Sequence, residues 1–396
     1  MVTEETFDVV VVGGGVIGLS IALALSRHSA CSLRIALIDA GRLESPAVSE
    51  GYHPRVLALT EQTIDWLSSI GAYQSINKDR VCSYSSMHVW DGEGTASIEF
   101  SAAQRHLEQL GVIVENDEIL RALLSQLENS GVTQLANQSV ENISVAEQTM
   151  IKLSSGKQIS TELLVAADGA QSTCRQLLGI TVQEHNYHQR AIVATLSSER
   201  AHERCARQVF LKTGPVALLP LEGQEQNRLS LVWSADEDVA SDLESLGDAE
   251  FAKALTKATE HVLGNLSLET KRYAFPLIRR HANQYVGKGW ALVGDAAHTI
   301  HPLAGQGANL GFSDAEVLVE EIIRQSQRGV RLFNPLSRYE RRRRIDNELT
   351  GLSMTGFKWL FGHSHPAAVV GRNFGLSLVN RTKWLKDWLL KQSQGR

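Results

Sequence analysis

The sequence predicts an α/β fold: a Rossmann-like dinucleotide-binding domain carries an inserted β-rich domain and a helical C-terminal region. Three observations predict this fold. The chain opens with an apolar run, a glycine-rich turn and a helical pattern. Two later apolar runs end at Asp168-Gly169 and at Gly294-Asp295. The chain between them holds β-rich segments that are typical of antiparallel sheet.

The first predicted element is a β-α-β unit. Val9–Val12 is a short β-branched run that predicts a buried parallel strand. Residues 16–28 have apolar side chains spaced by four, which predicts a helix, and Arg34–Asp39 predicts the next strand. Asp39 therefore stands at a strand end, where a carboxylate can meet a ribose hydroxyl.

The turn inside this unit has the spacing of a dinucleotide fingerprint, Gly13-x-Gly15-x-x-Gly18. In such a turn the first glycine permits the tight bend and the second lets a pyrophosphate approach the backbone. The third glycine lets the helix pack closely on the strand. The pyrophosphate would then lie at a helix N-terminus, whose free N–H groups and dipole favour an anion.

Two further strands of the same kind are predicted at Leu163–Ala167 and Ala291–Val293. The antiparallel segments are Ala191–Leu196, Val216–Leu219 and Leu229–Trp233, and a helical pattern begins near residue 311. The dinucleotide domain is thus expected to be discontinuous. Its expected parts are residues 1–72, 101–178 and 276–355, with a β-rich substrate domain at 73–100 and 179–275 and a helical region at 356–396.

Composition narrows the class of protein. A length of 396 residues favours two joined domains, and a net charge of −5 argues against a nucleic-acid partner. The four cysteines form no CxxC pair, so neither a zinc site nor a redox dithiol is indicated. The sequence has no basic leader and no apolar stretch long enough for a membrane span, so a cytoplasmic location is expected.

The segment from Asp295 to Asn309 predicts a second part of the cofactor site. Asp295 follows a strand and can accept a hydrogen bond from a ribityl or ribose hydroxyl. The helix start at Gly305–Asn309 offers backbone N–H groups and a positive dipole end to the negative charge of a reduced flavin. His298 and His301 are spaced as metal ligands can be, but the flavin motif already explains them, so no metal is expected.

These motifs carry a family resemblance that spans nearly the whole chain. GGGVIG at Gly13–Gly18, LLVAADGAQSTCR at Leu163–Arg175 and GDAAHTIHPLAGQGANLGF at Gly294–Phe312 resemble the class A flavoprotein monooxygenases of the para-hydroxybenzoate hydroxylase type. Within them the chain is most similar to the ubiquinone-biosynthesis hydroxylases, and closest to those that hydroxylate C5 of a 2-polyprenylphenol. Asp117 departs from the family pattern, in which this position is often uncharged or basic.

The resemblance implies a non-covalently bound FAD and a set of residues that contact it. Ser172 and Arg175 accompany the Asp168-Gly169 motif, which is associated with FAD and nicotinamide use. No catalytic base is indicated, and Pro302 and Gln306 are the candidates to face the flavin. The residues expected to bind FAD are Gly13, Gly15, Gly18, Asp39, Arg55, Asp168, Gly169, Asp295, Pro302, Gly305, Gly307 and Asn309.

The implied reaction is hydroxylation of a polyprenylphenol ring in ubiquinone biosynthesis, with NAD(P)H and O2 as co-substrates. No second GxGxxG unit is visible for NAD(P)H. Other readings stay open: an FAD reductase, a hydroxylase of another aromatic, or an FAD-binding subunit without turnover. An apolar wall for the substrate is expected from the β-rich segments, at Val193, Leu196, Val216, Leu218, Leu219, Val232 and Trp233.

Two basic segments bear on possible partners. Arg341–Arg344 is interpreted as a solvated helix face, because acidic residues interleave with it. Leu378–Leu390 reads as a basic, tryptophan-bearing amphipathic helix that either packs on the protein or contacts a membrane surface or a partner. A polyprenyl substrate would require such peripheral contact at the inner membrane surface, by this chain or by an associated ubiquinone-biosynthesis protein.

Overall fold

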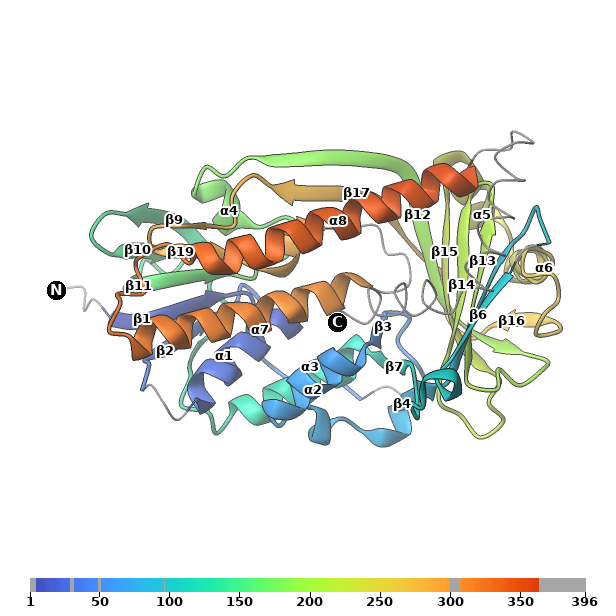
Figure 1. The fold of residues 1–396 in the computed structure, drawn as a ribbon, viewed down its shortest axis with the longest axis horizontal. Coiled ribbons are helices and arrows are strands. Elements are labelled where there is room, and N and C mark those ends of the chain that lie inside the picture. Colours follow the sequence, from blue (N-terminus) through green and yellow to red (C-terminus); the bar gives the residue numbers. More distant parts are fainter. Residues whose placement is uncertain (1–4, 29–31, 49–50, 96, 300–305, 363–396) are drawn as a thin grey trace.

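The computed structural model describes residues 5–28, 32–48, 51–95, 97–299 and 306–362. Figure 1 shows two parts side by side, a parallel sheet with its helices and a large sheet seen nearly edge-on. The helix α8 (Ser337–Gly362) runs along the surface from the first part to the second. The predicted α/β fold with an antiparallel insert is therefore confirmed.

The parallel sheet contains every strand predicted for the dinucleotide domain. Its order is β18-β19-β11-β1-β2-β8, and β1 pairs in parallel with both β2 and β11. All four residues of β2 are buried, as expected for a strand covered on both faces. The bounds are β1 (Glu5–Val12), β2 (Ile35–Ile38), β8 (Thr133–Leu135), β9 (Val140–Val145), β10 (Thr149–Leu153), β11 (Gln158–Ala166), β18 (Val286–Gly287) and β19 (Trp290–Leu292).

Helices cover this sheet. The helix α1 (Val16–Arg27) begins directly after the glycine turn, and its predicted start is confirmed. It packs closely on α7 (Gln306–Gln327), because a Cβ on Gly311 would stand only 3.0 Å from Ile17 Cδ1. The other helical elements are α2 (Glu61–Ser69), α3 (Asn116–Leu127), α4 (Thr173–Leu177), η1 (Tyr73–Ser75), η2 (Lys78–Arg80), η3 (Ala103–Arg105) and η4 (Gly294–Ala296).

The large sheet has the order β20-β17-β12-β15-β14-β13-β5-β6, with β16 also paired to β12. It is antiparallel except where β13 runs parallel to β5. A smaller sheet lies between the two parts and has the order β3-β7-β4. The bounds are β3 (Val56–Leu59), β4 (Val81–Tyr84), β5 (Ser86–Asp91), β6 (Ser97–Ser101), β7 (Gly111–Glu115), β12 (Val182–Ser198), β13 (Cys205–Leu211), β14 (Gly214–Pro220), β15 (Arg228–Asp236), β16 (Leu266–Leu268), β17 (Tyr273–Ala282) and β20 (His298–Thr299).

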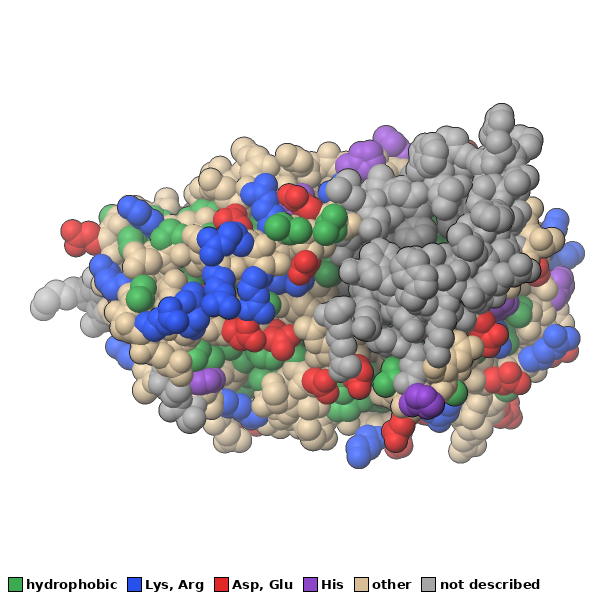
Figure 2. Space-filling view, viewed as in Figure 1, with side chains coloured by type: hydrophobic (Ala, Val, Ile, Leu, Met, Phe, Trp, Pro, Cys, Tyr) green, Lys and Arg blue, Asp and Glu red, His purple; other side chains and the backbone are tan. Residues whose placement is uncertain are grey.

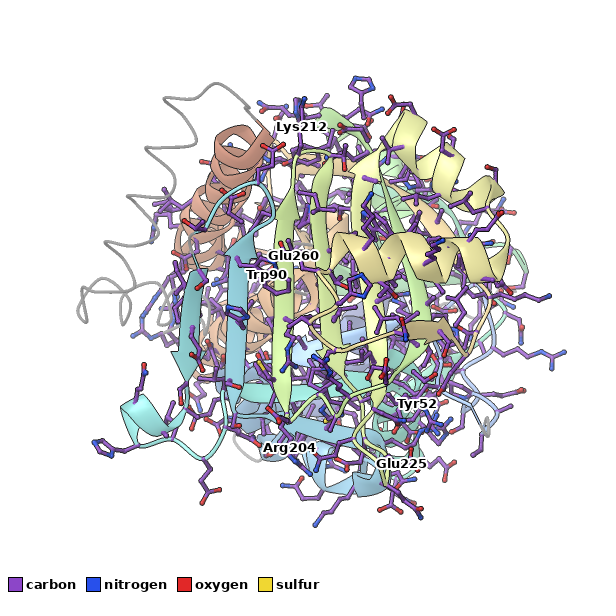
Figure 3. The ribbon with its side chains drawn as sticks, turned by 90° about the vertical axis from the view of Figure 1, so that its right-hand side faces the viewer. Tyr52, Trp90, Arg204, Lys212, Glu225 and Glu260 are labelled. Carbon is purple, nitrogen blue, oxygen red and sulfur yellow. The ribbon has the colours of Figure 1, made fainter. Side chains whose placement is uncertain are left out.

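The outer face of the large sheet is a core of its own. It packs against α5 (Glu237–Ser245) and α6 (Asp248–Ala258), which lie in front of the strands in Figure 3. At its rim Trp90 Nε1 donates to Glu260 Oε1 at 3.1 Å. Four residues of the predicted substrate wall lie in this outer core, namely Leu196, Val216, Leu218 and Trp233.

The inner face is turned toward the dinucleotide domain. Ala217, Leu219 and Val232 pack there with Ala58 and Ile113 of the smaller sheet. Val193 lies on the same face, because it is paired with Val232 and its neighbours in β12 belong to the outer core. The predicted wall is therefore wrong for four of its members, because side chains alternate between the two faces of a strand.

Candidate functional site

The glycine turn has no room for side chains at two of its predicted positions. Gly13 has φ +116°, and a Cβ there would stand 2.3 Å from the Ala167 carbonyl oxygen. A Cβ on Gly18 would stand 1.9 Å from the Gly13 carbonyl oxygen. These two glycines are therefore required by the fold itself, because strand and helix approach each other too closely for any larger residue.

Gly15 is different. A Cβ at this position would meet nothing within 4 Å, although the residue caps the N-terminus of α1. The first turn of α1 holds no acidic residue that would repel an anion. Open space in front of a helix N-terminus fits a pyrophosphate, so this turn passes a physical test for a dinucleotide cofactor.

Asp39 lies at the end of β2, as predicted, and its carboxylate is bonded to the turn. The Oδ2 atom accepts from Gly14 N at 2.5 Å and Oδ1 accepts from Gly41 N at 2.7 Å. The carboxylate thus joins the turn after β1 to the loop after β2. Its contact with a ribose stays a prediction.

The Asp168-Gly169 motif forms a small hydrogen-bonded cap. Asp168 accepts from Ser172 Oγ at 2.5 Å and from Cys174 N at 3.0 Å. Ser172 Oγ in turn accepts from Arg175 N at 3.0 Å, which caps α4. The buried Arg175 then reaches across the site: it donates to the Ala296 carbonyl at 2.8 Å and to the Ala170 carbonyl at 2.9 Å. The Asp168-Gly169 motif therefore holds the turn that contains Asp295.

Asp314 of α7 holds the same turn from the opposite side. This buried carboxylate accepts from Gly294 N at 3.2 Å and contacts His298 Nε2 at 2.5 Å. It also accepts from Arg343 Nε at 2.6 Å and from Asn347 Nδ2 at 3.2 Å. Burial alone would raise the pKa of Asp314, but His298 and Arg343 outweigh burial and lower it to about 2.

The sequence did not single out Asp314 and placed Arg343 on a solvated face. That expectation is wrong for Arg343, which is buried. A signal existed in the acidic residue that stands among apolar residues near the start of α7. His298, considered as a metal ligand, is instead the partner of Asp314, and His301 lies outside the described residues.

Asp295 lies in the turn that these two clamps hold. Its side chain is exposed, yet surrounding protein atoms desolvate it enough to raise the pKa of its carboxyl, while His298 and Arg55 act to lower that pKa. A carboxylate that is accessible but closely surrounded can bind a ligand hydroxyl and lose little conformational entropy when it does so. Asp295 fits the predicted hydrogen-bond acceptor for FAD.

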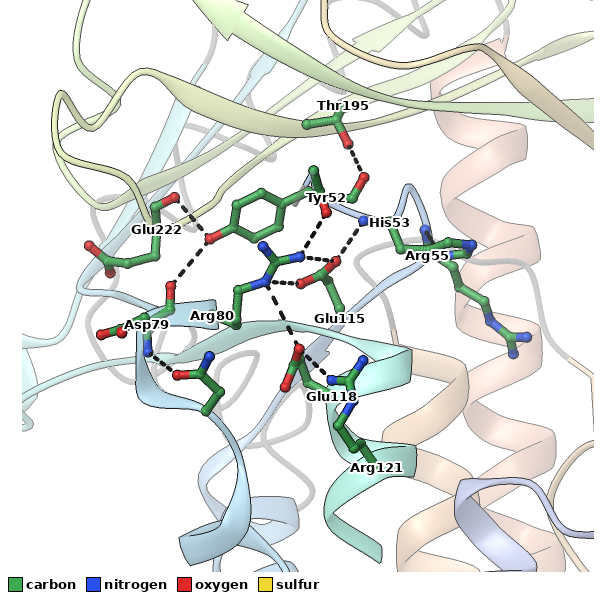
Figure 4. Close-up of polar contacts among 12 residues, drawn as sticks. Tyr52, His53, Arg55, Asp79, Arg80, Glu115, Glu118, Arg121, Thr195 and Glu222 are labelled. Carbon is green, nitrogen blue, oxygen red and sulfur yellow. Dashed lines mark hydrogen bonds and ion pairs between the residues drawn. The ribbon is translucent and has the colours of Figure 1, made fainter. Parts of the chain in front are cut away.

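Arg55 projects from a segment that a polar cluster anchors (Figure 4). Arg80 makes a bidentate salt bridge with the buried Glu115, in which Nε donates at 2.7 Å and Nη2 donates at 2.9 Å. Glu115 also accepts from His53 N at 2.6 Å, and Arg80 Nη2 donates to the Gly51 carbonyl at 2.9 Å. The segment 51–55 is thereby tied to the smaller sheet.

The same segment is tied to the large sheet through Tyr52. The phenol donates to the Glu222 carbonyl at 3.0 Å, and the Arg80 guanidinium lies 4.1 Å from the ring centroid. Thr195 of β12 donates to the Tyr52 carbonyl at 3.5 Å. Burial raises the pKa of Tyr52 to about 12, with Arg80 opposing, so the hydroxyl keeps its proton. In Figure 4 the Arg55 side chain points away from this cluster.

The N-terminal turns of α7 complete the described part of the site. A Cβ on Gly307 would meet nothing within 4 Å. Asn309 accepts from Thr63 Oγ1 at 2.7 Å and donates to the Ala58 carbonyl at 2.7 Å, which ties α7 to the strand that follows Arg55. Gln306 is the first residue of α7, and Pro302 and Gly305 lie outside the described residues.

Comparison with known proteins agrees with this geometry. The family model described as FAD binding domain matches residues 6–347. The chain is 33% identical to 3-demethoxyubiquinol 3-hydroxylase of Escherichia coli (strain K12), over 99% of this chain and 100% of the relative. It is 32% identical to the mitochondrial ubiquinone biosynthesis monooxygenase COQ6 of Drosophila melanogaster, over 100% of this chain and 91% of the relative.

Solved structures show the same fold. The p-nitrophenol 4-monooxygenase PnpA from Pseudomonas putida superposes with a TM-score of 0.77, at 20% identity and with 99% of each chain covered. PqsL from Pseudomonas aeruginosa superposes with a TM-score of 0.78, at 19% identity, over 93% of this chain and 99% of that protein. The chain belongs to the FAD binding domain family and is a class A flavin-dependent monooxygenase.

Proposed function

We propose that this protein hydroxylates the aromatic ring of a polyprenylphenol intermediate in ubiquinone biosynthesis, with NAD(P)H and O2 as co-substrates. The names of the relatives support this assignment. The composition of the inner sheet face supports it too. That face presents Ala217, Leu219 and Val232 toward the dinucleotide domain, and such a surface suits an apolar aromatic molecule.

The described residues would hold FAD in two places. The N-terminus of α1 at Gly15 would take the pyrophosphate, and Asp295 would take a hydroxyl of the ribityl chain. Asp39 would take a hydroxyl of the adenosine ribose, on the other side of the pyrophosphate, and Arg55, Gly169 and Gly307 would contact other parts of the cofactor. Bound FAD supplies the redox chemistry, in which it takes electrons from NAD(P)H and activates O2 for transfer of one oxygen atom to the ring.

The observation that carries the proposal is the double clamp on the Gly294–Ala296 turn. Arg175 holds its Ala296 carbonyl and Asp314 holds its Gly294 amide, so Asp295 is oriented before any ligand binds. The inner face of the large sheet then keeps water from the ring while the reaction proceeds. Orientation and exclusion of water are the contributions that this chain itself makes to the reaction.

The reaction is tested with purified, FAD-loaded protein and a short-tailed 2-polyprenylphenol. The phenol should accelerate NAD(P)H oxidation and gain one oxygen atom, and isotopically labelled O2 should deliver it. Para-hydroxybenzoate should be a poor substrate, because its carboxylate needs a cationic partner. Incorporation of oxygen from labelled water, or a strong preference for the small acid, would contradict the proposal.

We also propose that the chain contacts a membrane surface, since its substrate would reside there. Among the described helices none is long and apolar enough to cross a membrane. On α8, however, Ile345 and Leu349 are 60% and 59% exposed, and Arg341 lies one turn before Ile345. Figure 2 shows basic side chains gathered over this face. The predicted helix Leu378–Leu390 lies outside the described residues.

Ile345→Asp with Leu349→Asp tests this contact. The double variant should bind vesicles of anionic phospholipid more weakly than the native chain does, at unchanged FAD content. Arginines attract anionic headgroups and exposed apolar side chains enter the interface, so vesicles of neutral lipid should bind less of the native chain. Equal sedimentation of both proteins with anionic vesicles would remove α8 from consideration.

A further inference from the structure

Two large aromatic side chains are exposed on one strand of the large sheet. Tyr273 is 48% exposed and Phe275 is 55% exposed, and both lie in the first half of β17. At this level β17 is the edge of the sheet, because β20 pairs only with its far end at Arg280 and His281. Neighbouring exposed apolar side chains are typical of ligand-binding surfaces.

The strand register places both aromatic residues on the inner face. Tyr273 is paired with Val193 and Phe275 with Ala191, whereas Ala274 between them packs against the outer core. Ala191 belongs to a small buried cluster with Tyr187 and Leu277, against which Val232 packs. The exposed aromatics therefore extend the same apolar surface that is turned toward the dinucleotide domain.

The strand β17 runs from this surface to the cofactor turn. At its far end β17 pairs with β20, with His281 opposite His298, and His298 is held by Asp314. His281 lies six positions after Phe275, which is about 20 Å of extended strand. A ligand whose ring lies near Asp295 would need a long apolar extension to reach Phe275.

We propose that Phe275 and Tyr273 bind the polyprenyl tail of the substrate where it leaves the site at the edge of the large sheet. This inference rests on the proposed function, which supplies a ligand with a ring and a long tail. Val193, Ala191 and Leu277 form the floor of the surface, and the two aromatic side chains stand beside it. The tail is apolar along its whole length, and so is this surface.

The test compares substrates that differ only in tail length. Phe275→Ser should raise the KM for a phenol with four or more isoprene units about tenfold, which corresponds to losing the burial of about one large apolar side chain. The KM for a phenol with a single isoprene unit should not change, because its tail is too short to reach β17. Val330→Ser, at an exposed apolar position between α7 and α8, is the matched control and should change neither KM.

A binding measurement separates this inference from the proposed function. A polyprenyl alcohol without a ring should bind the native FAD-loaded protein and bind Phe275→Ser about tenfold more weakly. Equal binding by the two proteins, no binding by the native protein, or an equal rise of KM for both phenols would overturn the tail site. Binding of the alcohol without oxidation of either phenol would leave the tail site standing and refute the proposed reaction.

Discussion

The cofactor turn and the inner face of the large sheet are held in place by different kinds of interaction. The turn at Gly294–Ala296 is held by buried charged groups, Arg175 on one side and Asp314 with Arg343 on the other. The inner sheet face near Val193 and Val232 is mostly apolar and is held by strand pairing. The turn fixes a small polar group of a ligand at a defined point. The inner sheet face provides apolar contact area that does not fix the orientation of a ligand.

The two regions control different physical quantities. Directional hydrogen bonds in a low dielectric give orientation, and each buried partner is costly to remove. Apolar area gives affinity in proportion to the surface covered and tolerates movement of the ligand along it. A flavin must be held in one orientation, whereas a tail of repeating units needs only contact.

The largest effect is expected from Gly15 and Gly18, two glycines of the dinucleotide fingerprint. Gly18→Ala should unfold the domain or cost more than about 4 kcal/mol of unfolding free energy, because the new Cβ would collide with the Gly13 carbonyl. Gly15→Val should leave the melting temperature of the FAD-free protein unchanged, since its side chain meets open space. It should nevertheless weaken FAD binding by at least about tenfold.

Thermal melting of the FAD-free proteins and titration with FAD give the two readouts. A Gly15→Val protein that binds FAD like the native chain would mean that the pyrophosphate lies elsewhere. A stable Gly18→Ala protein would mean that α1 can move away from the strand, contrary to the close approach seen here. The pair distinguishes a glycine required by the fold from one required by the ligand.

Asp314→Asn should have the next largest effect. The change keeps the shape of the side chain but leaves Arg343 buried without its anion, which costs about 3–5 kcal/mol of unfolding free energy. FAD affinity should fall as well, because the Gly294 turn loses a partner. Asp346→Asn is the matched control, since this exposed carboxylate contacts the same guanidinium at 3.2 Å. Denaturant titration should show a loss of under about 1 kcal/mol for the control.

Much of the fold was predictable because its signals are local. Val9–Val12, the glycine turn and the helix that follows depend on residues adjacent in sequence, and the structure confirms them. The face of the large sheet that each strand residue occupies was not predictable. Alternation says that Val216 and Ala217 point to opposite sides, but only the packing of α5 and α6 decides which side is outer.

The buried ion pairs that hold the site could not be predicted from the sequence pattern either. Asp314 of α7 meets His298 of β20, and Glu115 of β7 meets Arg80 of η2, so neither pair has a fixed spacing in the sequence. Arg343 stands in a run of arginines whose neighbours are exposed, and composition could not separate it from them. Such contacts depend on tertiary approach, which the spacing within one element does not encode.

A pH effect should follow from His281, a buried neighbour of the Asp314 cluster. Burial lowers the pKa of His281 to about 4, with Glu348 opposing and His298, Arg344 and Arg279 adding to the shift. The unfolded chain takes up the proton near pH 6.5, before the folded chain does. The unfolding free energy should therefore fall as pH drops from about 6.5 to about 4. The slope of this fall should not exceed that for the uptake of one proton on unfolding.

Denaturant unfolding across this pH range measures the effect, and His281→Gln supplies the comparison. The variant cannot take up the proton, so its stability should decline less steeply between pH 6.5 and 4 than that of the native chain. Identical slopes for both proteins would show that His281 has the same proton affinity folded and unfolded. Above pH 7 the two proteins should differ only by a constant.

The smallest effect concerns the cluster that joins the two regions. Tyr52→Phe removes the hydroxyl that donates to the Glu222 carbonyl but keeps the ring under the Arg80 guanidinium. The loss should be about 1 kcal/mol of unfolding free energy.

FAD affinity should fall severalfold if the cluster positions Arg55. In Arg55→Ala protein, Tyr52→Phe should then change FAD affinity no further, because a positioning residue acts only through the group that it positions. Tyr84→Phe on β4 is the control and should leave FAD affinity unchanged in both backgrounds. FAD titration of the four proteins of the cycle decides the matter. Equal effects of Tyr52→Phe with and without Arg55 would assign the cluster to domain stability alone.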